Sequence, residues 1–136
     1  MRTPDLNAIA VDASCPGNPG PMEYRGVCLR TGKELFHFGP ITATNNIGEF
    51  LAVVHALALL HEKQSPLTIY TDSKTAQAWV RNRKAKTLLQ RTPETETALR
   101  LVQRAERWLR THACANPIEK WETKLWGEIP ADFGRK

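Results

Sequence analysis

The regular structure of this chain begins with the stretch Ala8-Ile9-Ala10-Val11-Asp12-Ala13-Ser14-Cys15-Pro16-Gly17-Asn18-Pro19-Gly20. Its first part, Ala8 to Ala13, is a short apolar run that predicts a buried strand. Its second part, Cys15 to Pro21, contains three prolines and two glycines, which break regular structure and predict a turn. Asp12 therefore belongs to the carboxyl end of a strand, which is the edge where ligands bind in open α/β sheets.

Two more strands and a helix are expected directly after the turn. Glu23 to Arg30 and Glu34 to Phe38 are joined by Thr31-Gly32, and such a short connection indicates antiparallel hairpins. The helix is capped by either Thr44 or Asn45. Its buried face follows the i, i+3, i+4, i+7 pattern and consists of Ile47, Phe50, Leu51, Val54, Leu57 and Ala58.

The second half of the chain alternates strands with helices. Pro66 ends the first helix, and the strand Leu67 to Thr71 runs directly into Asp72. A short helix follows, then the longest helix, opened by Thr92-Pro93, and a last strand, Ile118 to Thr123. The order βββαβααβ implies parallel pairing within a mixed sheet that has helices on its faces, and the predicted fold class is α/β.

The composition is that of one globular domain over residues 1–136. The chain is 41% apolar and has four tryptophans, which is typical of a packed core. Its net charge of +5 favours a polyanionic partner. The three cysteines show no CxxC spacing, so we interpret them as free thiols of a reducing compartment and expect a cytoplasmic protein. We expect no signal peptide and no membrane span.

Four carboxylates stand out by their positions. Asp12 and Asp72 each end an apolar strand, Glu49 lies early in the first helix, and Asp132 is in the C-terminal tail. Acids at strand ends and helix starts can converge on one edge of a sheet. Like charges oppose each other's ionisation, so such a cluster makes sense around hard divalent cations, which prefer oxygen ligands.

The motifs around these acids resemble those of one family. The blocks Val11 to Gly20, Thr44 to Glu49 and Tyr70 to Ser73 resemble the three motifs of type 1 ribonuclease H, and Ile129 to Asp132 supplies the fourth acid. The resemblance covers nearly the whole chain. It implies a ribonuclease H-like fold, with a mixed five-stranded sheet of three antiparallel strands plus parallel strands and helices on both faces. It also implies that residues 1–136 are one catalytic domain without a separate hybrid-binding module.

The resemblance implies an activity and a cofactor. The family cleaves the RNA strand of RNA–DNA hybrids with two Mg²⁺ or Mn²⁺ ions, leaving 5′-phosphate and 3′-hydroxyl ends. By position, Asp12 is expected to bridge both ions, Asp72 and Asp132 to hold the ion that activates water, and Glu49 to hold the other. Two ions about 3.5–4 Å apart stabilise both the attacking and the leaving oxygens of an in-line phosphoryl displacement.

Substrate contacts are expected from neutral and from basic side chains. Neutral hydrogen-bonding side chains beside the acids suit the 2′-hydroxyls of a hybrid duplex, and they belong to Asn18, Thr44, Asn45 and Asn46. The family implies this role for Asn45 and Asn46, and a contact with a DNA-strand phosphate for Thr44. Helix capping is the alternative for one of Thr44 and Asn45. The family also implies a basic protrusion that grips the duplex, and the basic segment of this chain is Arg81, Arg83, Lys84, Lys86 and Arg91, preceded by Lys74. The alternative for this segment is a solvated loop. Ser73, directly after the third acid, is a further candidate substrate contact.

The tail departs from the family's pattern in two ways. Many bacterial members have a histidine before the fourth acid, but none occurs between Trp121 and Asp132, and Glu128 is the candidate substitute. Many members also seat the fourth acid on a helix, whereas only four residues follow Asp132. We therefore expect Asp132 to lie on a flexible tail and to form the loosest part of the metal site.

Two other functions fit parts of the sequence. One is a different two-metal nuclease of the same broad fold, such as a resolvase or integrase core, although the Asn-rich block before Glu49 argues against it. The other is a non-catalytic hybrid-binding module that retains the acids for folding. We expect a monomer without an obligatory protein partner. The four histidines are not expected to bind metal, since even His55 and His61, on one helix, lie on different faces.

Overall fold

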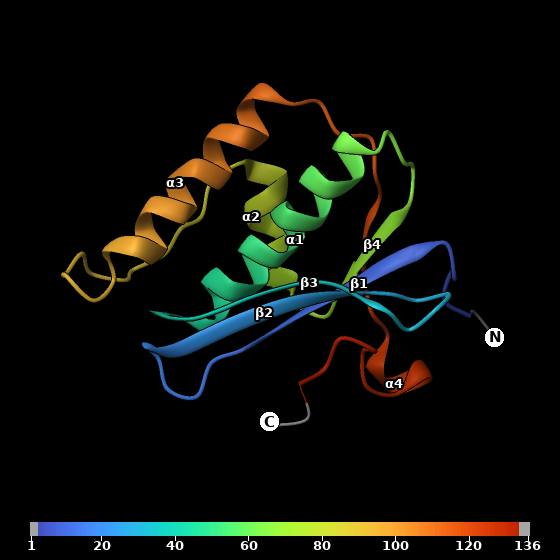
Figure 1. Cartoon of the computed structure of the whole chain (residues 1–136), viewed down its shortest axis with the longest axis horizontal. Coiled ribbons are helices and arrows are strands. Elements are labelled where there is room, and N and C mark those ends of the chain that lie inside the picture. Colours follow the sequence, from blue (N-terminus) through green and yellow to red (C-terminus); the bar gives the residue numbers. More distant parts are fainter. Residues whose placement is uncertain (1–2, 134–136) are drawn as a thin grey trace.

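The computed structural model describes residues 3–133. In this range the chain forms five strands and four helices (Figure 1), in the order β1 (Ala8–Ser14), β2 (Gly20–Cys28), β3 (Glu34–Ala43), α1 (Asn45–Glu62), β4 (Thr68–Thr71), α2 (Lys74–Asn82), α3 (Glu96–Thr111), β5 (Ile118–Lys120) and α4 (Thr123–Trp126). The predicted order is confirmed, and α4 is an additional short helix after the last strand.

The strands form one mixed sheet in the order β3-β2-β1-β4-β5. β1 pairs antiparallel with β2, and β2 with β3, whereas β4 is parallel to both β1 and β5. Figure 1 shows α1, α2 and α3 on one face of the sheet, and α4 with the C-terminal tail on the other. The predicted α/β class with a mixed five-stranded sheet and helices on both faces is therefore confirmed.

β2 and β3 extend further than the sequence pattern predicts. β2 begins at Gly20, which pairs with Ala43 at the end of β3, so the turn after β1 is shorter than expected. Pro40 lies within β3 because β3 is an edge strand, where a residue without an N–H group is tolerated. The pairing of the two strands thus overrides the prolines, which had suggested an earlier end to β3 and a later start to β2.

The helix starts follow their capping residues. Oγ1 of Thr44 accepts a hydrogen bond from the backbone N–H of Ile47 at 3.2 Å, so Thr44 is the cap of α1. The predicted start of α3 at Thr92-Pro93 is wrong. The backbone N–H of Thr92 donates to Oγ1 of Thr95 at 2.8 Å, which closes a turn before the helix begins at Glu96. With 18 residues, α1 is also longer than α3, which has 16, and β5 ends at Lys120 rather than Thr123.

The two faces of β1 are buried in different ways. Ile9, Val11 and Ala13 face the main core beneath α1. Ala8 and Ala10 face a second core on the other side of the sheet, whose members also come from β2, β4 and the C-terminal segment: Val27, Tyr70, Trp121, Ile129 and Ala131. Both faces of the central strand are therefore covered, as is typical of a strand with a parallel neighbour.

The C-terminal segment is packed against the sheet and is not loosely attached. Ile129 and Ala131 are 1% and 0% exposed, and Nε1 of Trp121 donates to the carbonyl of Gly127 at 2.8 Å. The expectation of a flexible tail is therefore wrong for the residues up to Ala131, directly before Asp132. Apolar side chains anchor this part of the tail, where a C-terminal helix was thought necessary. Among residues 3–133, no helix combines the length and apolar character needed to span a bilayer.

Candidate active site

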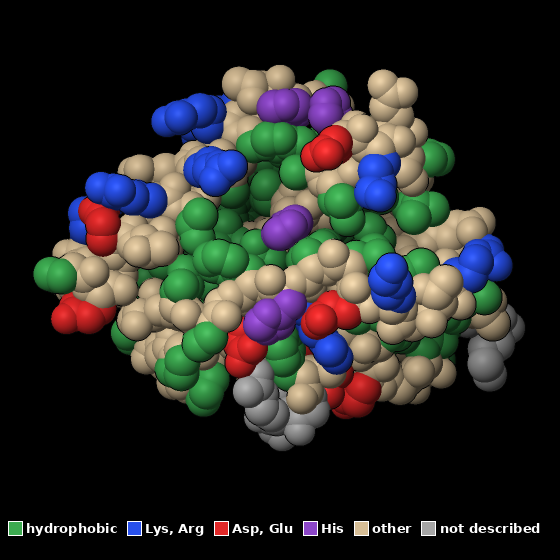
Figure 2. Space-filling model, in the orientation of Figure 1, with side chains coloured by type: hydrophobic (Ala, Val, Ile, Leu, Met, Phe, Trp, Pro, Cys, Tyr) green, Lys and Arg blue, Asp and Glu red, His purple; other side chains and the backbone are tan. Residues whose placement is uncertain are grey.

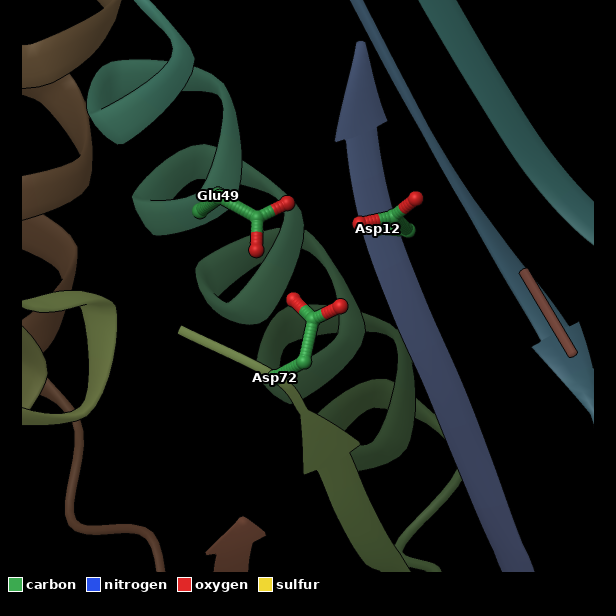
Figure 3. Close-up of side chains that lie close together, drawn as sticks. All are labelled: Asp12, Glu49 and Asp72. Carbon is green, nitrogen blue, oxygen red and sulfur yellow. The ribbon is translucent and has the colours of Figure 1, made fainter. Parts of the chain in front are cut away.

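Three carboxylates meet at one edge of the sheet. Asp12 comes from β1, Glu49 from the second turn of α1, and Asp72 from the residue after β4. Each contributes a carboxylate oxygen, and these oxygens lie within 4.8 Å of one another. Figure 3 shows the three side chains pointing toward one another. Asp12 is 1% and Glu49 2% exposed, whereas Asp72 is partly exposed, so the cluster opens to solvent on the side of Asp72.

The sheet topology brings Asp12 and Asp72 together. β1 pairs with β4 only from Ala8 to Ala10, and Asp12 lies two residues beyond the last pair. Asp72 follows the end of β4 on the same side. The carboxyl ends of neighbouring parallel strands lie at one edge of a sheet, where ligands bind. The strands separate just beyond their pairing, which leaves room for the side chain of Glu49 to reach in from α1.

Glu49 is placed by a close contact between α1 and the sheet. Its neighbour Gly48 lies against β1 and β2, and a Cβ atom there would stand 2.8 Å from Cγ of Met22 and 2.9 Å from Cβ of Ala13. Only glycine allows this approach without movement of the neighbours. The cap at Thr44 fixes where the helix begins. Together these two features bring the second turn of α1 close to Asp12.

The cluster is electrostatically strained without a counter-ion. Burial, followed by the charges of Asp12 and Asp72, raises the pKa of Glu49 well above its ordinary value. Oε1 of Glu49 is buried and accepts no hydrogen bond from the described part of the chain. Three carboxylates, one with a buried oxygen free to bind, form a hard oxygen donor set that fits a divalent cation such as Mg²⁺ or Mn²⁺.

The fourth predicted acid, Asp132, lies outside this group of three. It sits on the tail that crosses the face opposite α1, where its backbone N–H donates to the carbonyl of Ile129 at 2.9 Å. Its own backbone carbonyl accepts a hydrogen bond from the guanidinium of Arg25 at 2.7 Å. Glu128, the predicted auxiliary residue, is exposed and makes no hydrogen bond or ion pair with residues 3–133.

A groove of about 720 Å³, which we call the Trp79 groove, opens beside the N-terminus of α1. Three of the predicted substrate residues, Asn18, Thr44 and Asn46, line it. Its remaining lining includes Trp79 of α2, Lys86 and the first turn before α3. Asn45 is the first residue of α1 and is exposed, but it does not line the groove. Amide, hydroxyl and ammonium groups thus line a single groove near the acid cluster.

Residues of the predicted basic segment line different cavities. Lys86 lines the Trp79 groove, whereas Arg81 and Arg83 line a separate cavity of about 310 Å³. Nζ of Lys84 lies 3.8 Å from Oε2 of the buried Glu106. Residues 84–92 contain no helix or strand and connect α2 to α3 as an extended loop. Figure 2 shows further Lys and Arg side chains gathered over α3.

Two predicted substrate residues lie at the start of α2. Oγ of Ser73 accepts a hydrogen bond from the backbone N–H of Ala76 at 3.0 Å and so caps the helix. Lys74 is the first residue of the helix and is exposed. Their positions directly after Asp72 place both at the edge of the sheet that holds the acid cluster.

Sequence reasoning missed two residues that organise this region. Oε2 of Glu106 accepts a hydrogen bond from the backbone N–H of Ala85 at 2.8 Å and thereby anchors the loop from α3. The apolar periodicity of α3 gave a weak signal, because Glu106 interrupts its buried face beside Ala105. Arg25, which contacts the tail, gave no local signal, since its partners lie more than one hundred residues away.

One histidine away from the acids has a distinctive environment. The hydroxyl of Tyr24 and Nδ1 of His55 lie 2.8 Å apart, and the ring of His55 stacks on Phe36 with a centroid distance of 4.0 Å. Burial raises the pKa of Tyr24 to about 12 and lowers the pKa of His55. At neutral pH both groups are therefore uncharged, and the imidazole tautomer sets the direction of the hydrogen bond: the hydroxyl donates when Nε2 carries the proton and accepts when Nδ1 carries it.

Comparison with known proteins gives a consistent set of matches. The RNase H family model matches residues 6–119 of the chain. A ribonuclease H of Chromobacterium violaceum is 37% identical over 91 residues, which are 63% of this chain and 61% of that protein. A ribonuclease H of Paracidovorax citrulli is 46% identical over 69 residues, which are 48% of this chain and 44% of that protein. The matches thus span about half of these curated relatives.

Solved structures share the fold. LC11-RNase H1, isolated from compost by a metagenomic approach, has a TM-score of 0.58 and 18% identity, and the match covers 87% of this chain and 85% of that one. A structure of LC11-RNase H1 in complex with an RNA/DNA hybrid has a TM-score of 0.55 and 17% identity, with coverage of 87% and 86%. At these identities the similarity establishes the architecture alone.

Proposed function

The chain belongs to the ribonuclease H family, and from this premise we propose that it hydrolyses the RNA strand of RNA–DNA hybrids with two Mg²⁺ or Mn²⁺ ions, leaving 5′-phosphate and 3′-hydroxyl ends. The observation that carries the proposal is the group of Asp12, Glu49 and Asp72, which meets where the carboxyl ends of β1 and β4 approach α1. We place this activity in a single catalytic domain, residues 1–136, that acts as a monomer in the cytoplasm.

The proposed ligands divide between two cation positions. Asp12 would be shared by both cations, Glu49 would help to hold one, and Asp72 together with Asp132 would help to hold the other. Divalent cations bound there would activate the attacking water and neutralise charge on the leaving oxygen. The fixed position of Asp12 and Glu49, both buried, keeps the donor oxygens in place before substrate arrives. The partly exposed Asp72 marks the side from which the scissile phosphate enters.

The Trp79 groove, beside the acids, is the proposed binding site of the hybrid. Asn18, Thr44 and Asn46 present hydrogen-bonding groups along it, with Asn45 adjacent, and these groups suit sugar hydroxyls and phosphates of an A-like duplex. Thr44 has a dual role here, because its side chain also caps α1. The fold relative LC11-RNase H1 has been solved with an RNA/DNA hybrid, which is consistent with this class of substrate.

The remaining proposed contacts are electrostatic. Lys86 within the groove is assigned to the duplex backbone, and Ser73 and Lys74 to phosphates near Asp72. The wider basic set, which attracts the duplex without reading its sequence, adds Arg81, Arg83 and Lys84. Glu128 is proposed as an auxiliary acid that assists turnover from the tail.

One experiment tests the function directly. Labelled RNA–DNA hybrid, double-stranded RNA, double-stranded DNA and a DNA junction are incubated with the protein in Mg²⁺, Mn²⁺ or EDTA, beside Asp12→Asn protein purified in the same way. Cleavage of the RNA strand of the hybrid alone, lost in EDTA and in the variant, supports the proposal. Cleavage of DNA junctions would indicate a resolvase-like nuclease. Hybrid binding without metal-dependent cleavage would indicate a non-catalytic binding module.

A further inference from the structure

Arg25 in β2 holds the C-terminal tail. Its Nε donates to the carbonyl of Ala131 and its Nη2 to the backbone carbonyl of Asp132, both at 2.7 Å. Its guanidinium carbon lies 5.1 Å from the ring centroid of Phe133, and its Nη1 is 3.7 Å from Oε1 of Glu34. The side chain is only 27% exposed, so contacts on several sides hold it in one orientation.

Arg25 is also the direct neighbour of Asp12 in the sheet. The register of β1 and β2 pairs Asp12 with Arg25. Side chains directly opposite each other in an antiparallel pair project from the same face, with Cβ atoms about 4.5–5.5 Å apart. Ala8 and Ala10, which share the face of Asp12, pack in the second core with Ala131. The segment that Arg25 holds therefore crosses the face from which Asp12 projects.

We propose that Arg25 is the positioning residue that presents Asp132 to the metal centre, replacing the support of a C-terminal helix. The inference rests on the proposed function, in which Asp132 is a ligand. Arg25 binds two consecutive carbonyls through a planar fork, and these carbonyls belong to the two peptide groups that flank Asp132. Because the orientations of these two groups set the direction in which the Asp132 side chain leaves the backbone, the contact aims the carboxylate.

The neighbouring contacts complete the support. Ile129 and Ala131 are buried in the second core, and the backbone N–H of Asp132 donates to the carbonyl of Ile129, so the chain turns tightly just before the acid. These contacts hold the tail on the sheet as far as the amide of Asp132 but do not include its carbonyl, which belongs to the following peptide. Arg25 supplies the polar contact that fixes this carbonyl together with that of Ala131, and a lysine, as a single point charge, would not fix both.

The test is a double-mutant cycle with metal binding as its readout. Mn²⁺ affinity is measured by calorimetry without substrate, together with kcat and KM for hybrid cleavage, in Arg25→Ala, Arg25→Lys, Asp132→Asn and Arg25→Ala/Asp132→Asn. We expect Arg25→Ala to weaken Mn²⁺ binding and lower kcat by about 10- to 100-fold, the range for residues that orient a metal ligand, with KM little changed. Arg25→Lys should rescue little. The double variant should be no worse than Asp132→Asn, because both changes remove the same interaction.

The control is Arg30→Ala, which removes an equal charge from the exposed turn after β2, where Nη2 of Arg30 donates to Oδ1 of Asn7. Additive losses in the double variant, or wild-type Mn²⁺ affinity in Arg25→Ala, would overturn the positioning role. Either result leaves cleavage by the wild-type protein intact, and so separates this failure from failure of the proposed function. If the wild-type protein does not cleave hybrid, hydrogen exchange at the Asp132 amide still decides: unchanged protection in Arg25→Ala would refute the contact's role.

Discussion

Gly48 of α1 and Met22 of β2 are in closer contact than any residue with a Cβ atom would allow. A Cβ atom at position 48 would stand 2.8 Å from Cγ and 2.9 Å from Sδ of Met22. The next residue along α1 is Glu49, whose carboxylate meets Asp12 and Asp72. The contact therefore sets the distance between the helix that provides one acid and the sheet that provides the other two.

Gly48→Ala should loosen the acid cluster. Overpacking a tight contact costs about 1–3 kcal/mol, partly offset by the better helix propensity of alanine, about 1 kcal/mol. We expect a small net loss of stability and a clear loss of Mn²⁺ affinity, because α1 must move away from β1. Thermal melts and calorimetry measure the two effects. Adding Met22→Ala should recover part of the affinity, and an undiminished Mn²⁺ affinity in Gly48→Ala alone would show that the cluster tolerates movement of α1.

Asp12→Asn should abolish cleavage while hybrid binding stays largely intact. The amide cannot supply the charge of a bridging carboxylate, but the substrate groups along the Trp79 groove are unchanged. Removing one of three clustered like charges also relieves the repulsion that helps to raise the pKa of Glu49. The melting temperature in EDTA should therefore stay level or rise. Glu62→Gln, at the exposed end of α1, is the control, and substantial residual activity of Asp12→Asn in saturating Mg²⁺ would argue against the bridging role.

Lys86 should contribute more to binding of the duplex than its basic neighbours do. It lines the Trp79 groove, whereas Arg81 and Arg83 line another cavity. Lys86→Ala should raise KM for the hybrid with kcat less affected, and should reduce the slope of log K against log[salt] by about 0.9 if one phosphate contact is lost. Arg107→Ala is the control. It removes the same charge from a position on α3 that lies about 18 Å along the helix from Thr95. Equal effects of the two variants would mean that only net charge matters.

His55 should make the fold less stable in mild acid. Burial lowers its folded-state pKa below the ordinary value of 6.5, so the unfolded chain takes up a proton first as the pH falls. Stability is then lost between about pH 6.5 and the lower folded-state pKa, and is unaffected above this window. His55→Gln should flatten the dependence, whereas Tyr24→Phe should retain it because burial is the cause. Denaturant melts from pH 7 to pH 5 measure this, and parallel curves for wild type and His55→Gln would contradict the assignment.

Glu128→Ala tests the auxiliary role assigned to the tail. If Glu128 assists turnover, kcat should fall about tenfold or more while KM is unchanged. A positioned acid–base group contributes roughly 10²–10⁴-fold, and the expected loss lies within this range or just below it. Glu122→Ala, on the segment before α4, is the matched control. Wild-type steady-state rates with an unchanged metal titration would leave Glu128 as an exposed surface acid, where a salt bridge contributes only about 0–1 kcal/mol.

The sequence was sufficient where local patterns carry the information. Asp12 and Asp72 were predicted to meet because each ends an apolar run, and Glu49 because it lies near the start of a periodic helix. The helix start at Thr92-Pro93 was wrong because Thr92 and Thr95 form a hydrogen-bonded turn ahead of α3, and a propensity rule does not distinguish two threonines of similar capping ability.

The support of Asp132 was out of reach of the sequence. A short tail suggested flexibility, but Ile129 and Ala131 occupy the second core, and Arg25 contacts carbonyls 106 and 107 residues away. Backbone carbonyls carry no residue identity, so no motif marks the positions that Arg25 binds. The strand register that sets Arg25 opposite Asp12 is likewise a property of the assembled sheet.

The second core has a consequence for how the protein is made. It joins Ala8 and Ala10 to Trp121, Ile129 and Ala131, so one face of the central strand cannot be buried until Ala131 has left the ribosome. Until then this face is an exposed apolar surface of the kind that aggregates or engages chaperones. The second core therefore closes only after the segment from Trp121 to Ala131 has been synthesised, and until that point the sheet stays open on one side.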